Sequence, residues 1–299
     1  MTRVVRARAV MLVVVAGVLG PCIVWAQPSK EDKDVREEAE EAQRAMDLFL
    51  REQKVLIRRG EVWFELNSLY STDTRDDFVV SGSAIGFAKV LTRVAEASLV
   101  ARYGLLNDLG VDLRVPFVYA SQEINLGGTR LRKEDYGLGD VGGGLKYQVW
   151  REGPGTPDIV LSLEGRAPTG KEPLLGTGHW SVGATIGLVK TFDPVVLFGR
   201  VGYAASLGDG ADDPGDVVAY QFGIGYSLND RVSLTTQLTG AVVVDGANVQ
   251  DTNREIISLQ FSVTMRVTKH LFMEPFVAVG LTQAARDVIV GVSVPYQFK

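Results

Sequence analysis

Beyond Gly60 the chain alternates between apolar and polar or small residues, in segments of about ten residues. At its start Val62 and Phe64 have one parity, whereas Glu65 and Asn67 have the other. Neighbouring side chains of a strand point to opposite faces. Each segment is therefore predicted to be a strand with one apolar face, and positions such as Val111, Leu161 and Phe261 belong to that face in later segments.

The connections between these segments alternate between short and long. Residues 104–108, 151–157, 192–194, 229–230 and 268–269 form short turns, and residues 72–91, 123–136, 169–177, 206–216 and 244–253 form longer loops rich in Asp, Gly and Thr. Short periplasmic turns and long external loops are typical of outer-membrane barrels. The pattern predicts an all-β membrane protein, an antiparallel up-and-down transmembrane β-barrel of about twelve strands over residues 60–299, although the last external loop, 282–286, is short.

Charged residues occupy the parity opposite to the apolar one. A charge facing lipid at mid-depth costs about 2–4 kcal/mol, so these residues are expected to face the interior and to line a pore. Acids and bases balance there, which predicts cross-strand ion pairs rather than selectivity for one sign of ion. Glycines of the same parity either relieve strain in a curved sheet or leave space for a solute or a helix. The predicted pore-lining residues are Glu65, Glu96, Arg102, Asp112, Arg114, Asp140, Lys146, Glu164, Arg166, Arg200, Arg266 and Glu274.

Residues 1–26 have the three parts of a secretory signal. Three arginines precede an apolar run, and Val24-Trp25-Ala26 precedes the expected cut between Ala26 and Gln27. The apolar run is too short to cross a bilayer as a helix. Cys22, the one cysteine, lies within this segment, so the processed chain is expected to have no disulfide or thiolate metal site.

Residues 27–59 predict one amphipathic helix in the periplasm. The segment 29–59 is charged and glycine-free, its apolar residues recur at helical spacing, and Ser29 is a suitable N-cap. Three interpretations remain open: a solvated extension, a helix packed into the barrel lumen, or a helix paired with its own copy.

Composition excludes several classes of function. The net charge of −5 argues against a nucleic-acid-binding surface, and two histidines argue against a histidine-rich metal centre. The mean hydropathy is +0.10, yet no apolar run of eighteen residues follows the signal. We therefore expect neither a cofactor nor a nucleic-acid partner.

Several segments resemble the outer-membrane proteins grouped as the MetA-pathway of phenol degradation family. They are Tyr136-Gly-Leu-Gly-Asp-Val-Gly-Gly-Gly-Leu-Lys-Tyr147, Arg166-Ala-Pro-Thr-Gly170, Gly176-Thr-Gly-His-Trp-Ser181, Arg102-Tyr-Gly-Leu-Leu-Asn-Asp108, Val115-Pro-Phe-Val-Tyr119 and Gly199-Arg-Val-Gly-Tyr203. The resemblance covers the chain from about Gly60 to its end. It implies an outer-membrane barrel and uptake of hydrophobic or aromatic compounds. Barrels of this kind often end on an aromatic assembly signal, whereas here Lys299 follows Phe298.

Two motifs with possible chemistry are weak. Residues 165–171 fit a phosphate-binding loop, but Glu172 and Pro173 replace the hydroxyl and the helix that should follow. His179 and Ser181 share a strand face, as in the outer-membrane phospholipase A family. That family's pair faces lipid, whereas this pair is predicted to face inward, and no orienting partner is evident. The chain is therefore not expected to be an enzyme.

The sequence thus predicts a channel in the bacterial outer membrane for passive uptake of small, hydrophobic or aromatic solutes. A structural or surface-interaction protein with a plugged lumen is the alternative, and a membrane lipid hydrolase is a third. Expected partners are outer-membrane lipid and lipopolysaccharide, the barrel-assembly machinery and a small-molecule solute.

Overall fold

A computed structural model describes residues 57–81, 84–126, 129–208, 215–245 and 255–298. The expected signal sequence, its cut after Ala26 and the expected helix up to residue 56 lie outside these ranges. Within the ranges every regular element is a strand, and no helix is long and apolar enough to span a membrane.

Thirteen strands make up the described fold. Their bounds are β1 (Val62–Ser81), β2 (Ala84–Gly104), β3 (Leu109–Leu126), β4 (Thr129–Leu138), β5 (Val141–Trp150), β6 (Asp158–Ala167), β7 (Ser181–Phe192), β8 (Val195–Ser206), β9 (Asp216–Asn229), β10 (Val232–Asp245), β11 (Glu255–Arg266), β12 (Phe272–Gly280) and β13 (Val288–Phe298).

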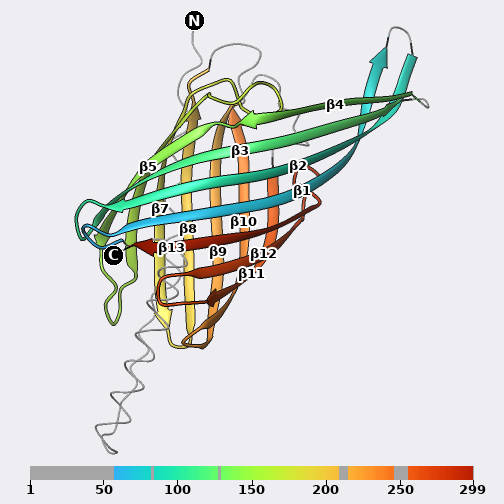
Figure 1. The fold of residues 1–299 in the computed structure, drawn as a ribbon. Coiled ribbons are helices and arrows are strands. Elements are labelled where there is room, and N and C mark those ends of the chain that lie inside the picture. Colours follow the sequence, from blue (N-terminus) through green and yellow to red (C-terminus); the bar gives the residue numbers. More distant parts are fainter. Residues whose placement is uncertain (1–56, 82–83, 127–128, 209–214, 246–254, 299) are drawn as a thin grey trace, which may run out of the picture. The chain divides into compact units, whose positions relative to one another are not determined.

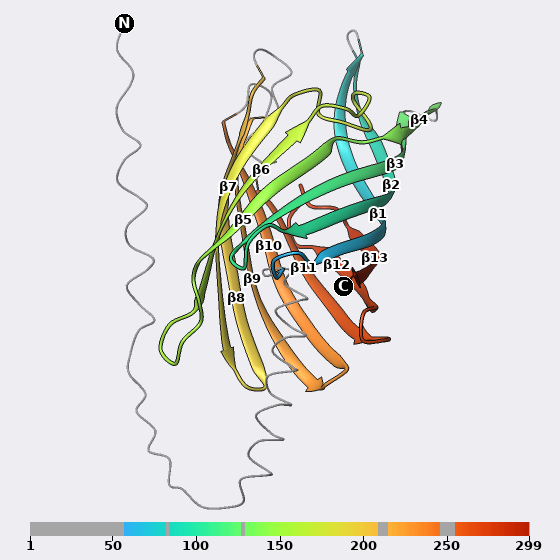
Figure 2. The same cartoon turned by 60° about the vertical axis from the view of Figure 1, so that its left-hand side comes forward.

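The strands close into one antiparallel ring. The order runs β2-β1-β13 and then backwards through the chain to β5-β3, and the pairing of β2 with β3 closes it. Strands β4 and β5 both pair with the same edge of β3, end to end, so thirteen strands fill twelve positions. The predicted barrel of about twelve strands is confirmed (Figures 1 and 2).

The period-two pattern determines which face each residue occupies. Leu161 is 45 % exposed on the outer face, whereas its neighbour Val160 is 6 % exposed and faces the lumen. Residues paired across strands share a face, so one assignment fixes the others: Leu161 pairs with Tyr147 and with Ile186. The exposed apolar residues therefore form a continuous outer surface, as lipid contact requires.

Two segments that were predicted to be long loops are largely β-strand in the structure. Residues 72–81 pair with residues 84–93, and residues 123–126 pair with residues 129–132, so β1 and β3 continue far beyond the partners β13 and β5 that hold them in the ring. Pairing of β1 with β13 stops at Thr72, whereas its pairing with β2 continues to Ser81. We call this part of β1–β4 the projecting sheet: residues 73–81, 84–93, 119–126 and 129–138 (Figure 1).

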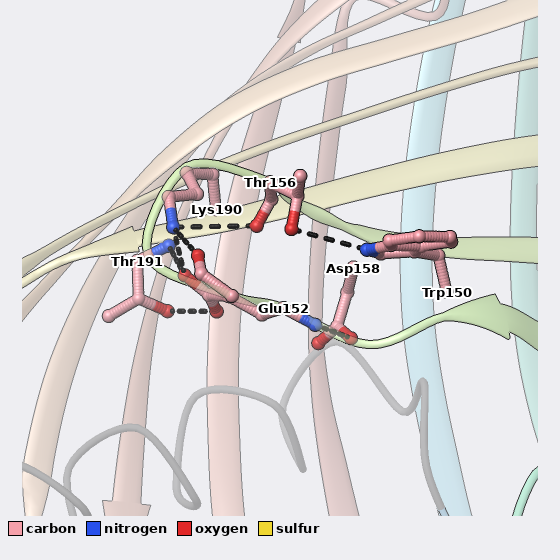
Figure 3. Close-up of polar contacts among 7 residues, drawn as sticks. Trp150, Glu152, Thr156, Asp158, Lys190 and Thr191 are labelled. Carbon is pink, nitrogen blue, oxygen red and sulfur yellow. Dashed lines mark hydrogen bonds and ion pairs between the residues drawn. The ribbon is translucent and has the colours of Figure 1, made fainter.

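At the short-turn end, one carboxylate ties two hairpins together (Figure 3). Glu152, in the turn 151–157, accepts hydrogen bonds from Thr191 N at 2.8 Å and Thr191 Oγ1 at 3.0 Å, and pairs with Lys190 Nζ at 3.0 Å. Its own backbone N–H donates to Asp158 Oδ1 at 2.7 Å. These contacts connect the β5–β6 turn to the end of β7 and stiffen that rim.

Candidate functional site

The lumen contains a buried ion pair between the first two strands. Glu65 Oε2 accepts from Arg102 Nη1 at 2.6 Å, and Ser293 Oγ donates to Glu65 Oε1 at 3.0 Å. Only 2 % of Glu65 is exposed. A carboxylate this buried must be paired, because removing a charge from water otherwise costs several kcal/mol. The contacts therefore join β1, β2 and β13 from inside.

Two further ion pairs cross the lumen wall between neighbouring strands. Arg114 pairs with Glu96. Lys146 Nζ lies 3.1 Å from Asp112 Oδ1. The cross-strand pairing expected from the balanced charges is therefore present at three places, counting the Glu65 pair.

The remaining charged residues of the predicted set follow the same parity, with one exception. Glu164, Arg166 and Arg200 are exposed on the inner face, and Gly142, Gly144 and Gly187 lie beside them in register. Glu274 pairs in register with Ser293 on the inner face, and Arg266 ends β11 next to Phe272.

Asp140 is the exception, because it lies in the break between β4 and β5. Its carboxylate accepts hydrogen bonds from Gly170 N at 3.0 Å, Thr177 N at 2.8 Å and Thr177 Oγ1 at 2.9 Å. Thr169 Oγ1 also accepts from Val141 N at 2.9 Å and donates to the carbonyl of the residue before Asp140 at 2.7 Å. Asp140 thus holds the 168–180 loop at the point where the wall divides.

That loop places apolar side chains inside the barrel. Leu175 is buried against Val118 and Ala120, with Leu174 and Val94 beside them. Val118, Ala120 and Val94 have the inward parity on β3 and β2, so Leu175 covers the inner wall at the long-loop end.

The lumen has two further apolar clusters at the short-turn end. Val189, Val196 and Phe198 form one buried cluster, and Trp63 stacks on Phe272 with a centroid separation of 6.2 Å. All five side chains have the inward parity. The sequence prediction assigned only charged and small residues to this face, although the run 195–198 is apolar at both parities and indicated an apolar inner position.

Inner-face glycines allow aromatic rings to lie flat against the wall. A Cβ at Gly223 would overlap the ring of Phe198, and a Cβ at Gly291 would overlap the ring of Phe276. Cross-strand packing of this kind covers the backbone where glycine leaves it bare. At these two places the neighbouring ring fills the space beside the glycine Cα, so the glycine leaves no open space in the lumen.

The first of the two weak motifs has a structural role, and the second has no catalytic contact among the described residues. In residues 165–171 the polar groups contact the strand break, and Lys171 Nζ pairs with Asp135 Oδ2 at 2.6 Å. His179 lies in the loop before β7 and Ser181 begins β7, and no hydrogen bond between their side chains is found among the described contacts. Within the described ranges, no cluster of three or more His, Cys, Asp or Glu residues could hold a metal ion.

Comparison with solved structures finds the same barrel in outer-membrane channels. The COG4313 outer membrane channel from Pseudomonas putida F1 superposes with a TM-score of 0.62 at 14 % identity, over 81 % of this chain and 97 % of that one. The NanC porin superposes with a TM-score of 0.50 at 10 % identity, over 77 % and 98 %. These likenesses support a bacterial outer-membrane location.

The family model agrees with the sequence resemblance. A model described as the MetA-pathway of phenol degradation matches residues 71–298, which include most of the barrel. The two solved barrels are described as an outer-membrane channel and a porin. The chain belongs to the MetA-pathway of phenol degradation family of outer-membrane β-barrel proteins.

Proposed function

We propose that this chain is a passive channel through which small hydrophobic or aromatic solutes cross the outer membrane. The observation that carries the proposal is the apolar inner wall at both ends of the barrel. Leu175 with Val118 and Ala120 lies at the external end, and Phe198 with Val196 lies at the periplasmic end. A lumen for ions alone gains nothing from apolar side chains on its wall, whereas an apolar solute that packs against such a wall is stabilised in proportion to the apolar area it covers.

The paired charges between these surfaces fit the same function. The ion pairs satisfy one another across β1–β2, β2–β3 and β3–β5, so the wall presents little net charge to a solute. An uncharged molecule can then pass without an electrostatic barrier, and no counter-ion has to accompany it.

Uptake by whole cells tests the proposal. Cells that express the chain should take up a radiolabelled monoaromatic hydrocarbon faster than cells with an empty vector, with no change for a charged sugar of similar size. Replacing Phe198 and Val196 with serine should lower the hydrocarbon uptake, because both lose apolar contact area. Equal uptake with and without the chain would refute the proposal.

A matched control separates the inner wall from general damage to the barrel. Leu197 lies between the two tested residues but faces outward, where it is 45 % exposed. Leu197→Ala should therefore leave uptake unchanged at equal amounts of folded protein in the membrane.

A barrel with a filled lumen is the second candidate, favoured by the burial of inner side chains on the first strands. Ser98 and Glu65 are 1 % and 2 % exposed although they face the lumen. Conductance in planar bilayers with and without residues 27–58 distinguishes the two. A large current in both forms favours the open channel, and a current that appears only after the deletion favours a plug formed by that segment.

We also propose contacts outside the lumen. The outer face would meet outer-membrane lipid and lipopolysaccharide, and β13, which ends at Phe298, would be recognised by the barrel-assembly machinery. Accumulation of the unfolded chain after Phe298→Ala would support that recognition.

A further inference from the structure

The outer face of β1–β4 contains a row of tyrosines at one level. Tyr70 pairs in register with Ala95, Ala95 with Tyr119, and Tyr119 with Tyr136. The three tyrosines are 45 %, 38 % and 72 % exposed. Aromatic residues at one level of a barrel surface mark the membrane interface, so this row lies at the boundary with the lipid headgroups.

Beyond the tyrosine row the outer face becomes cationic. Three further outward rows cross β1, β2, β3 and β4 in that order, each two residues beyond the last. They are Thr72, Arg93, Ser121 and Glu134; then Thr74, Leu91, Glu123 and Arg132; and then Asp76, Lys89, Asn125 and Arg130. Each row lies about 7 Å further along the strands, so the four cations lie within about 20 Å of the tyrosines.

The two cations on β4 are partly neutralised. Arg130 Nε lies 2.8 Å from Glu123 Oε1, and Arg132 Nη2 lies 2.8 Å from Glu134 Oε2. The Tyr119 hydroxyl and then Glu134 raise the pKa of Arg132, so its charge is permanent. Both arginines remain more than half exposed and keep donors free for another anion.

The two cations on β2 have less compensation. Arg93 is exposed between Thr72 and Ser121, and Lys89 is exposed between Asn125 and the register position of Asp76. No ion pair to either residue is found among the described side chains. The three outward rows contain four cationic residues against three acidic ones, Glu134, Glu123 and Asp76, so by residue type the face has a net charge of one positive unit.

The rest of the outer face differs. Among the described outward positions above the membrane level, β9 has Asp216, which accepts from Tyr203, and β11 has Glu255. Lys171 and Arg286 at the same end are turned inward, where Lys171 pairs with Asp135 and Arg286 donates to Ser71 at 2.7 Å. Among the side chains that the structure describes above the tyrosine row, the outward cations are therefore those of β2 and β4.

We propose that this face of β2 and β4 binds the phosphate groups of lipopolysaccharide in the outer leaflet. Acyl chains would cover the apolar surface below the tyrosine row, and Arg93, Arg132, Lys89 and Arg130 would meet the phosphates above it. A guanidinium presents paired donors that match phosphate oxygens, and such bonds are stronger than neutral ones. The opposite wall, with carboxylates at this level, would repel the same headgroup.

Binding of purified full-length protein to diphosphorylated lipid A in detergent tests the proposal. The double variant Lys89→Gln/Arg93→Gln should bind about thirtyfold more weakly, which corresponds to about 2 kcal/mol, because each cation near an anionic surface contributes about half of that energy. Lipid A without phosphates should bind the original protein and the variant equally. Arg130→Gln/Arg132→Gln is a second, independent variant, and heat-modifiable migration on gels establishes that each is folded.

The control changes the same charge at the periplasmic rim. Arg231 and Lys269 are exposed in short turns, so Arg231→Gln/Lys269→Gln should leave lipid A affinity unchanged. Unchanged affinity in both β2 and β4 variants would overturn the proposal, as would equal weakening in the control. Displacement of lipid A by millimolar inorganic phosphate would also overturn it, because a site for free phosphate would not depend on the lipid.

Discussion

Replacing Asp140 with asparagine tests how the 168–180 loop is held at the strand break. The carboxylate accepts three hydrogen bonds, from Gly170 N and from both Thr177 N and Oγ1. Asparagine has one acceptor oxygen and one amide group that cannot accept. It can keep the bonds to Thr177 in a weaker, uncharged form, but its NH₂ group then faces the N–H of Gly170.

The size of the effect follows from these contacts. A hydrogen bond to a charged group contributes about 1.5–3 kcal/mol. Thr177 is exposed at this site, so screening by water reduces the sum. We expect Asp140→Asn to weaken docking of the loop by about 2 kcal/mol, which is about a thirtyfold rise in the undocked population.

Limited proteolysis measures that population. Lys171 lies in the loop and is exposed, and cleavage after it requires the backbone to leave its docked position. When opening is fast compared with cleavage, the cleavage rate follows the open population. Trypsin should therefore cut after Lys171 about thirtyfold faster in Asp140→Asn. Asp216→Asn, at the first position of β9, should leave that rate unchanged.

An equal cleavage rate in Asp140→Asn and the original protein would refute the reasoning. It would mean that the packing of Leu175 on Val118 and Ala120, rather than the carboxylate, holds the loop.

Three other changes test separate parts of the barrel. Glu65→Gln leaves Arg102 without its charged partner in a buried site, so unfolding should become easier by about 3–5 kcal/mol, measured as a lower melting temperature of the folded band on gels. Gly223→Ala displaces the Phe198 ring into the lumen, which should lower both single-channel conductance and, by about 1–3 kcal/mol, stability. Lys171 lowers the pKa of Asp135 below its ordinary 3.8, so the contact stabilises the loop above that pH and is lost only as pH falls through the lowered value; hydrogen exchange of the loop amides measures the loss.

Each of these has an outcome that contradicts it. Glu65→Gln with an unchanged melting temperature would show that Ser293 and Arg102 adjust to a neutral partner. Full conductance in Gly223→Ala would show that the Phe198 ring moves away from the pore. Loss of amide protection well above pH 3.8 would show that Asp135 is not the titrating group, and Lys171→Met should remove this pH-dependent protection because the ion pair is absent.

The sequence predicted the barrel well because a membrane imposes a strict alternation. Along β6, Leu161 and Leu163 face outward and Glu164 and Arg166 face inward, and nothing else in the segment competes with this pattern. Counting such segments leads directly to twelve strand positions.

The projecting sheet could not be predicted in the same way. Above the membrane both faces of a strand meet water or polar loops. The sequence around Asp73 and Arg75 on β1 therefore does not alternate between apolar and polar residues, and its pattern predicts a loop. Asp140 was assigned to the lumen for a related reason, because parity alone shows neither where a strand breaks nor which loop returns to it. The inner apolar residues were missed since Val196 and Phe198 have apolar neighbours on both sides.

The break before Asp140 also leaves β4 with one open edge, since among the described strands it pairs only with β3. Unpaired backbone donors and acceptors invite a strand from another molecule, and crowded membrane proteins meet many such strands. The sequence of β4 counters this risk, because four of the five positions from Arg130 to Glu134 are charged. A second chain that approached that edge would have to remove these charges from water, so the molecule can extend a bare strand beyond the lipid and remain a separate barrel.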